Sequence, residues 1–121
     1  MSRELLNIED IAKVCHNVNM RYCEALGDKS QVKWEDAPEW QKYSAMDGVQ
    51  FHLKNPDVTA EDSHNNWLAE KIKNGWKYGP IKDAEKKEHP SCIPYDKLLT
   101  SEKVKDILFK EVVESLRDKI V

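Results

Sequence analysis

Apolar side chains recur every three or four positions over residues 8–26, which predicts an amphipathic helix there. Asn7 is a suitable N-cap, and Gly27 follows the last apolar position and favours a helix stop. Because the opposite face is polar, this helix must pack against other elements. Its apolar stripe comprises Ile8, Ile11, Ala12, Cys15, Val18, Tyr22 and Leu26.

A second helix is predicted after a connector, residues 27–40, that is rich in turn-forming residues. Asp36 followed by Pro38 indicates its start, and its apolar positions continue to Leu53. Gly48 interrupts the helical pattern, because glycine weakens a helix interior.

A third helix is predicted over residues 60–74. Thr59 and Asp62 have the spacing of a capping box, and Gly75 suits the position just after the helix end. The side chains expected on or near one face are His64, Trp67, Leu68, Lys71 and Ile72.

After this helix the period of the pattern changes from about four to two. Trp76 and Tyr78 are therefore predicted to point one way and Lys77 the other, in an extended segment that crosses the core. Gly79 and Pro80 then turn the chain.

A last helix is predicted to begin with Ser101 as its cap. Its stripe comprises Val104, Ile107, Leu108, Val112, Leu116 and Ile120. The pattern as a whole predicts a mainly α protein, a compact bundle of about four helices with one short extended or β segment around Trp76–Tyr78.

Composition narrows the class of protein further. A length of 121 residues suits a single domain, and 19 basic against 22 acidic side chains leave no basic field for a nucleic acid partner. We find no leader sequence and no apolar run long enough to cross a membrane, so a cytoplasmic location is expected. Three cysteines outside any C-x-x-C pattern are expected to remain reduced.

Neither a metal site nor a catalytic site is predicted. The four histidines, His16, His52, His64 and His89, show no spacing that places two ligands on one helical face. Cys15 adjoins His16, but neighbours on a helix point about 100° apart and do not form a dyad. We therefore expect no cofactor, no metal and no enzyme activity.

The aromatic residues around the end of the third helix are the most distinctive feature. Trp67 and Trp76 flank that helix end, Tyr78 follows, and Lys71 lies one turn after Trp67 on the same face. Such residues commonly build a small core. The alternative is a slot in which a planar ring stacks on an indole, while a lysine meets a phosphate or carboxylate. The candidate lysines are Lys71, Lys82, Lys86 and Lys87.

The segment "SHNNWLAEKIKNGWKYGPIKDAEKKEHPSCIPYDKL" resembles the ryanodine receptor repeat, or RyR domain. The family pattern runs His-x-x-Trp, Lys-Ile-x-x-Gly-Trp-x-Tyr-Gly-Pro, an Asp, then Lys-x-His-Pro and Pro-Tyr. The matching residues are His64, Trp67, Lys71, Ile72, Gly75, Trp76, Tyr78, Gly79, Pro80, Asp83, Lys87, His89, Pro90, Pro94 and Tyr95.

The resemblance implies one RyR-like domain over residues 1–121. Residues 34–116 form its repeat-like core, and residues 1–27 resemble the additional N-terminal helix of single-copy bacterial and phage members. The family often has His-Pro-Cys-Leu where this chain has His89-Pro90-Ser91-Cys92, so no fixed role is assigned to a cysteine in this loop.

In calcium-release channels the repeats occur in tandem, as peripheral helical modules, and paired repeats are associated with adenine nucleotide binding. The resemblance therefore implies a base held by tryptophans such as Trp67 and phosphates held by nearby basic residues. This chain carries one copy, and a homodimer could rebuild a pocket that needs two.

Two functions are consistent with these features. The first is a non-catalytic protein-interaction or scaffold domain, whose partner is an unknown protein or a second copy of the chain. The second is a sensor that binds an adenine nucleotide or a similar planar anion. The predicted ligand-binding residues are Trp67, Lys71, Trp76, Tyr78 and Lys87. The residues assigned to the structural motif are His64, Gly75, Gly79, Pro80, Asp83, His89, Pro90, Pro94 and Tyr95.

Overall fold

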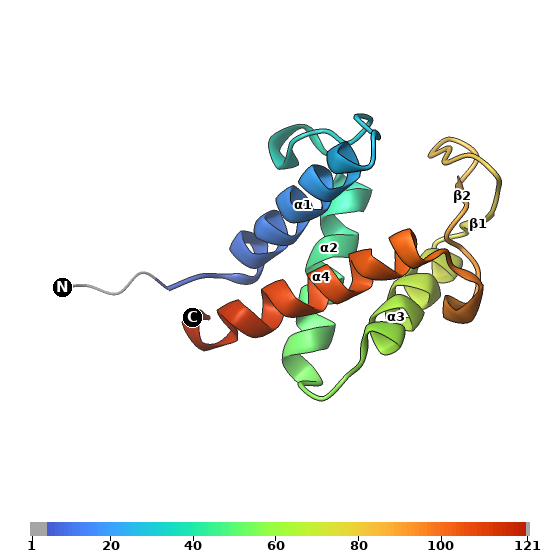
Figure 1. Cartoon of the computed structure of the whole chain (residues 1–121). Coiled ribbons are helices and arrows are strands. Elements are labelled where there is room, and N and C mark those ends of the chain that lie inside the picture. The colour runs from blue at the N-terminus through green and yellow to red at the C-terminus, as the bar shows by residue number, and fades with distance from the viewer. Residues whose placement is uncertain (1–4, 121) are drawn as a thin grey trace.

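The computed structural model describes residues 5–120, so residues 1–4 and 121 of the predicted domain lie outside the described residues. Within this range the chain forms four α-helices and one small two-stranded sheet (Figure 1), which confirms the predicted mainly α fold. The helices are α1 (Ile8–Ala25), α2 (Glu39–Lys54), α3 (Ala60–Lys73) and α4 (Thr100–Leu116), with β1 (Lys77–Tyr78), β2 (Glu88–His89) and 3₁₀ turns η1 (Trp34–Asp36), η2 (Tyr95–Lys97) and η3 (Arg117–Lys119).

Two helix starts are fixed by reciprocal side-chain caps, as the sequence predicts. The Asn7 side chain accepts a hydrogen bond from the Asp10 amide, and the Asp10 carboxylate accepts one from the Asn7 amide. Thr59 and Asp62 form the same arrangement at the start of α3. Each capping box satisfies two amides that would otherwise lack partners.

Glycines end α1 and α3 by adopting the left-handed conformation, with φ of 94° at Gly27 and 88° at Gly75. After α3, the Gly75 amide donates to the Ile72 carbonyl and the Trp76 amide donates to the Lys71 carbonyl. This pair of bonds is the Schellman motif, and it fixes where Trp76 leaves the helix.

Two predicted helix starts are wrong. Asp36 belongs to η1, and Pro38 rather than Asp36 occupies the N-cap of α2. The cause is Pro38 itself, which holds the preceding Ala37 in an extended conformation, so the helix cannot begin earlier. Likewise Leu99 is extended and is the N-cap of α4, so Ser101 lies inside that helix.

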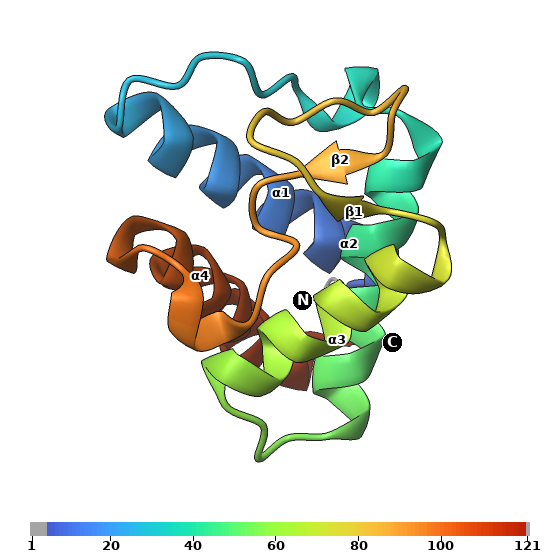
Figure 2. The ribbon, with the colours of Figure 1, turned by 90° about the vertical axis from the view of Figure 1, so that its right-hand side faces the viewer.

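The core lies where α1, α2 and α4 meet, while α3 packs against α2 and α4 (Figure 2). The Leu6 amide donates to the Lys119 carbonyl at 2.7 Å, which joins the segment before α1 to η3. The fully or nearly buried core side chains are Ile11, Ala12, Cys15, Trp34, Val49 and Val113.

The extended segment does not cross the core, which corrects the prediction. Strand β1 pairs in parallel with β2 at the surface, with Lys77 opposite Glu88 and Tyr78 opposite His89. Trp76 is buried, but Tyr78 is 56% exposed, so the two aromatic side chains do not share one environment. The reason is that the chain enters the strand directly from the Schellman turn, which places only Trp76 against the helices.

Hydrophobicity alone also misplaces residues on two helices. On α3 the apolar Ile72 is 61% exposed, whereas the charged Lys71 is 2% exposed. On α4 the predicted stripe residue Ile107 is exposed, and Val113 is the side chain that is completely buried. On α3 a charged residue thus occupies an inward position that the pattern assigns to an apolar one, whereas on α4 the fully buried position belongs to an apolar residue, Val113, that the predicted stripe did not include.

Gly48 does not interrupt α2, contrary to the expectation from its position. It allows α4 to approach closely, because a β-carbon at this position would lie 2.8 Å from Cζ of Phe109. Phe109 packs against the buried core, so its ring has little freedom to move aside.

We predict that Gly48→Ala destabilises the protein by about 1 kcal/mol or more, because overpacking outweighs the better helix propensity of alanine. Urea unfolding measures the change in the free energy of unfolding. In a Phe109→Leu background the same substitution should be neutral or stabilising. Equal effects of Gly48→Ala in both backgrounds would contradict the assignment of this contact.

Candidate functional site

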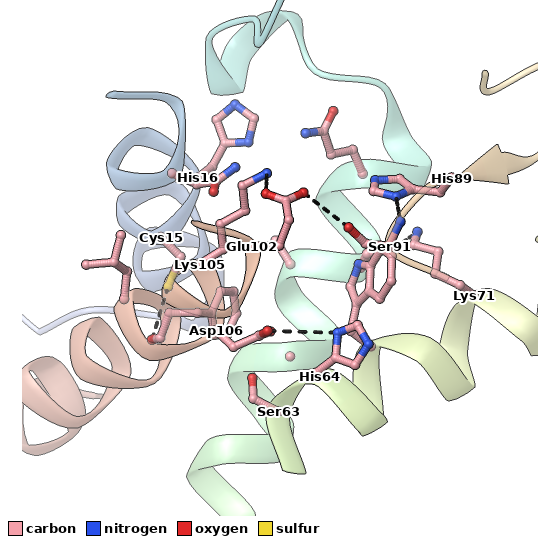
Figure 3. A pocket seen from close by; sticks show the side chains of 18 of the residues that line it. Cys15, His16, Ser63, His64, Lys71, His89, Ser91, Glu102, Lys105 and Asp106 are labelled. Carbon is pink, nitrogen blue, oxygen red and sulfur yellow. Dashed lines mark hydrogen bonds and ion pairs between the residues drawn. The ribbon is translucent and has the colours of Figure 1, made fainter. Parts of the chain in front are cut away.

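The inward stripes of the helices change from apolar to polar toward one end of the bundle. On α4, Glu102, Lys105 and Asp106 precede Phe109 on the same stripe, at helical spacings. On α1, His16 and Asn19 continue the stripe of the buried Ile11 and Cys15. These polar side chains line a pocket of about 350 Å³ (Figure 3).

Residues from every helix and from the loop around β2 contribute to this pocket. Helices α2 and α3 supply tryptophans, α1 and α4 supply polar side chains, and the loop supplies a lysine and a histidine. The polar and aromatic lining residues that determine the chemistry of the pocket are Asn19, Trp40, Ser44, His64, Trp67, Lys71, Lys82, His89, Ser91, Glu102, Lys105 and Asp106.

Lys71 is the most buried charged side chain of the site. Its Nζ donates to Ser44 Oγ at 2.6 Å and lies 3.5 Å from Glu70 Oε1, while Ser44 Oγ itself donates to Glu70 Oε1. Burial lowers the pKa of Lys71, and the charge of Glu70 opposes that shift. The short chain from ammonium to hydroxyl to carboxylate thus compensates the charge inside the protein.

Three indole rings surround the same ammonium. Lys71 Nζ lies 4.7 Å from the ring centroid of Trp40, 5.1 Å from that of Trp76 and 6.0 Å from that of Trp67. These distances allow cation–π attraction, which is strongest where water is excluded. Trp76 is buried and Trp67 is half-buried, and both rings lie beside the Lys71 cation at the edge of the pocket.

Lys82 and Lys105 bring two more ammonium groups to the pocket. Lys105 Nζ lies 2.8 Å from Glu102 Oε2. Burial acts to lower the pKa of Lys105, but the hydrogen bond to Glu102 and the charge of Glu102 outweigh burial, so the pKa is raised above its ordinary value. Lys82 Nζ lies 5.7 Å from the Trp40 centroid and forms no ion pair with any residue of the described range 5–120.

The surroundings of Lys82 disfavour its charge. Much of its side chain is exposed, but crowding by protein around the ammonium lowers its pKa, and the positive charges of Lys105 and Lys71 lower it further. Three like charges in one pocket repel each other. A negative charge placed beside Lys82 would relieve that repulsion.

His89 supplies a neutral hydrogen-bond donor. Its Nδ1 accepts a hydrogen bond from the Ser91 amide at 3.0 Å, so in the neutral ring the proton resides on Nε2. Burial, followed by the charges of Lys82 and Lys105, lowers the pKa of His89 to about 4. The ring is therefore uncharged at neutral pH and packs edge-on against Trp67, with centroids 5.1 Å apart.

His64 and Asp106 face each other across the pocket floor (Figure 3). His64 Nε2 donates to the Ile93 carbonyl at 2.8 Å, and its Nδ1 lies 3.8 Å from Asp106 Oδ2. Burial, together with the nearby charge of Glu102, raises the pKa of Asp106 to about 7. The carboxyl is thus partly protonated at neutral pH, and the His64 ring stacks on Trp67.

One serine–histidine pair lies next to this floor. Ser63 Oγ is 2.9 Å from His52 Nε2, which is a distance seen between nucleophile and base in hydrolases. However, His52 Nδ1 is buried and has no hydrogen-bond partner among the described residues, so no acid orients the ring. The groups that meet in the pocket, flat rings and cations, are better suited to binding than to covalent chemistry.

The structure separates the five predicted ligand-binding residues. Trp67 and Lys71 line the pocket. Trp76 lies against the Lys71 ammonium and, with Lys87, lines a second hollow of about 280 Å³, which shares Trp40 and Lys71 with the pocket. Lys87 Nζ donates to the Asn74 carbonyl at 2.9 Å, and the exposed Tyr78 lines neither cavity.

The motif residues hold the loop that closes the pocket. Gly79 is required for β1 to approach β2, because a β-carbon there would lie 2.5 Å from Glu88 Cβ. The Asp83 side chain accepts hydrogen bonds from the amides of Glu85 and Lys86, which orders the turn between the strands. Gly75 ends α3, and Pro80 follows β1. The motif residues that line the pocket are His64, His89 and Pro90. Pro94 is the N-cap of η2, and the Tyr95 ring lies 6.0 Å from that of His64.

The sequence alone did not identify five residues that line the pocket: Asn19, Trp40, Glu102, Lys105 and Asp106. A usable signal existed on α4, where three charged residues occupy the positions that extend the core stripe of Phe109 toward the helix start. Such residues on an inward face indicate a polar site rather than a solvated surface.

We predict that Asp106→Asn stabilises the protein at neutral and higher pH. Because the folded state raises the carboxyl pKa from 3.8 to about 7, the stability from its bound proton is present below about pH 4 and lost as pH rises through 7. We therefore subtract the free energy of unfolding of the variant from that of the wild type. This difference should fall by a few kcal/mol between pH 4 and 7, because each pKa unit corresponds to about 1.4 kcal/mol, and it should then stay constant at higher pH.

Urea unfolding of both proteins across this range measures the difference, in which the opposing contribution of His89 cancels because both proteins contain it. A difference that is constant with pH would show that the Asp106 carboxyl titrates normally.

Residues 5–120 contain no group of three or more histidine, cysteine, aspartate or glutamate side chains placed to hold a metal ion. None of the four helices in that range has the length and apolar character needed to cross a bilayer.

A comparison with protein families identifies a family for the chain. The family model described as the RyR domain matches residues 49–118, which is more than half of the chain. The matched range begins within α2 and ends in η3, so it includes α3, the strand loop and α4, and with them most of the pocket wall. The resemblance noted from the motif residues is thereby confirmed, and the chain belongs to the RyR domain family.

Proposed function

We propose that this RyR domain is a non-catalytic binding module whose pocket binds a small anion that carries a planar ring, such as an adenine mononucleotide. The main support for this proposal is the position of the Lys82 ammonium. This group lies over Trp40, beside two other lysines, and has no ion-pair partner in the described part of the chain.

Electrostatics favours an anion at this position. Lys71 and Lys105 lie within ion-pair distance of Glu70 and Glu102, whereas Lys82 forms no ion pair with a residue of the range 5–120, and the charge of Asp28 opposes the repulsion from beyond ion-pair distance. A phosphate or carboxylate would form charge-assisted hydrogen bonds with Lys82, and these are stronger than neutral ones. Burial of the ammonium by surrounding protein is the main cause of the lowered pKa of Lys82, and a bound anion would offset the second cause, the repulsion from Lys105 and Lys71.

The rest of the pocket suits a flat ring of limited size. Trp40 and Trp67 offer indole surfaces, and His89 Nε2 offers a neutral donor beside them. A volume of about 350 Å³ lies near the lower end of the usual range for small-molecule pockets, roughly 300–1,000 Å³. This size favours a mononucleotide over a dinucleotide. The pocket is lined by one chain, so the proposal needs no second repeat.

A protein-interaction role is the second candidate, and one observation favours it. The loop that carries Lys82 on its pocket side also carries Ile81, which is 76% exposed, and follows the exposed Tyr78. Apolar groups exposed in this way often contact partners. A ligand at Lys82 and a protein at Ile81 would therefore act on the same loop.

We predict that AMP raises the melting temperature of the wild type and that Lys82→Met weakens AMP binding at least tenfold. A ligand at about 100 times its dissociation constant adds roughly 2.7 kcal/mol to the folded state, which corresponds to several degrees. Thermal-shift titrations with AMP, ADP, ATP, adenosine and sulfate provide the measurement. Lys86→Met is the matched control, because Lys86 belongs to the same loop but does not line the pocket.

A flat response to every nucleotide at millimolar concentration would overturn the ligand proposal. An equal response to sulfate would mean that only the charge is recognised. The interaction role is tested by the double variant Tyr78→Ser/Ile81→Ser, which should abolish recovery of any specific partner while AMP binding stays intact. Partner recovery that is unchanged by the double variant would remove this loop as the contact.

A further inference from the structure

Asn19 is the one side chain of the pocket wall that contains a buried polar atom without a partner in the described residues. It lies on α1, one turn after Cys15 and His16, and all three residues line the pocket. Its Oδ1 is buried and accepts no hydrogen bond from any residue in the range 5–120. Native proteins rarely leave such an atom unpaired without a functional reason.

Other amide side chains of the same wall are paired, so the pocket does not lack donors and acceptors in general. Asn66 Nδ2 donates to Asp47 Oδ2 at 3.2 Å, and Gln41 Nε2 donates to Gln31 Oε1 at 3.4 Å. Within the range 5–120, Asn19 Oδ1 differs from the other amide oxygens of the wall because it is both buried and unpaired. A leucine of similar size would fill the same space without the cost of an unpaired acceptor.

We propose that Asn19 Oδ1 accepts a hydrogen bond from a neutral N–H or O–H group of the bound ligand, so that the ligand class is an anion that also carries such a donor. This inference rests on the proposed function and names the chemistry of the same pocket. Within nucleotides the donor is either the exocyclic amine of the base or a hydroxyl of the sugar.

The charges of the pocket argue for a neutral donor rather than a cationic one. The three ammonium groups of Lys71, Lys82 and Lys105 repel any cationic group of a ligand. The carboxylate of Glu102 is already paired with Lys105 and accepts from Ser91 Oγ. Asp28 accepts from both the amide and the hydroxyl of Ser30.

Specificity follows from this arrangement. A ligand that lacks the donor leaves Asn19 Oδ1 buried and unpaired, as it is in the ligand-free protein, whereas a ligand that carries the donor gains a hydrogen bond there. Sites built around such a hydrogen bond reject analogues without it far more strongly than apolar pockets reject a missing methyl group. Asn19 is therefore a specificity residue for the ligand.

The test compares the wild type with Asn19→Leu, and uses Asn17→Leu as a control on the same helix, since Asn17 does not line the pocket. Asn19→Leu should raise the melting temperature of the ligand-free protein, because it removes an unpaired polar atom, and should weaken AMP binding at least tenfold. The control should change neither quantity. The probes are AMP, its analogue without the amino group, and deoxyadenosine monophosphate.

For the wild type, one of the two analogues should bind about tenfold more weakly than AMP, and that analogue identifies the donor. The Asn19→Leu variant should bind that analogue and AMP with equal affinity. AMP binding of equal strength to the wild type and to Asn19→Leu overturns this inference and leaves the proposed function in place. No AMP binding to either protein overturns both. A lower melting temperature of both Asn19→Leu and Asn19→Ala shows that Asn19 has a partner within the fold, which also overturns the inference.

Discussion

The buried ammonium of Lys71 constrains the arrangement of the rest of this end of the molecule. Removing a charged group from water is costly unless charges, hydrogen bonds or aromatic faces replace the solvent. Here Ser44 and Glu70 supply the polar contacts, and three indole rings supply the remaining shell. Those rings come from α2, from α3 and from the residue after the Schellman turn, so the three segments must meet at one point. The loop that follows is then held over the same point by β1 and β2.

The same helices serve a dry core at one end and a polar pocket at the other. Their inward stripes carry Ile11, Val49 and Val113 in the core, but Asn19, Lys105 and Asp106 around the pocket. The polar residues lower stability, through an unpaired oxygen on Asn19, a raised carboxyl pKa on Asp106 and lysines that repel each other. Proteins retain such groups where function requires them, and the apolar end supplies the stability that the pocket lacks.

Most helix caps and stops that depend on neighbouring residues were predicted, with the starts at Asp36 and Ser101 as exceptions, whereas features that depend on tertiary contacts were not predicted. The caps at Asn7 and Thr59 and the stops at Gly27 and Gly75 depend on neighbouring residues alone, so the sequence was sufficient. Asp36 failed as a cap because Pro38 controls the backbone before it, and Gly48 was misread because its role depends on Phe109, 61 residues further along the chain. Trp67 and Lys71, close in sequence, were found together as candidates for the site. Trp40, Asn19 and Lys105 were missed because only the folded bundle brings their segments to the same pocket.

A crystal structure of the protein grown with saturating AMP would show directly whether the polar end of the bundle binds a planar anion. We expect the adenine ring to stack on an indole of the pocket, that of Trp40 or Trp67, and the phosphate to lie within hydrogen-bond distance of Lys82 Nζ. AMP located outside the four-helix pocket, or a pocket closed by an ion pair between Lys82 and a protein carboxylate, would contradict it.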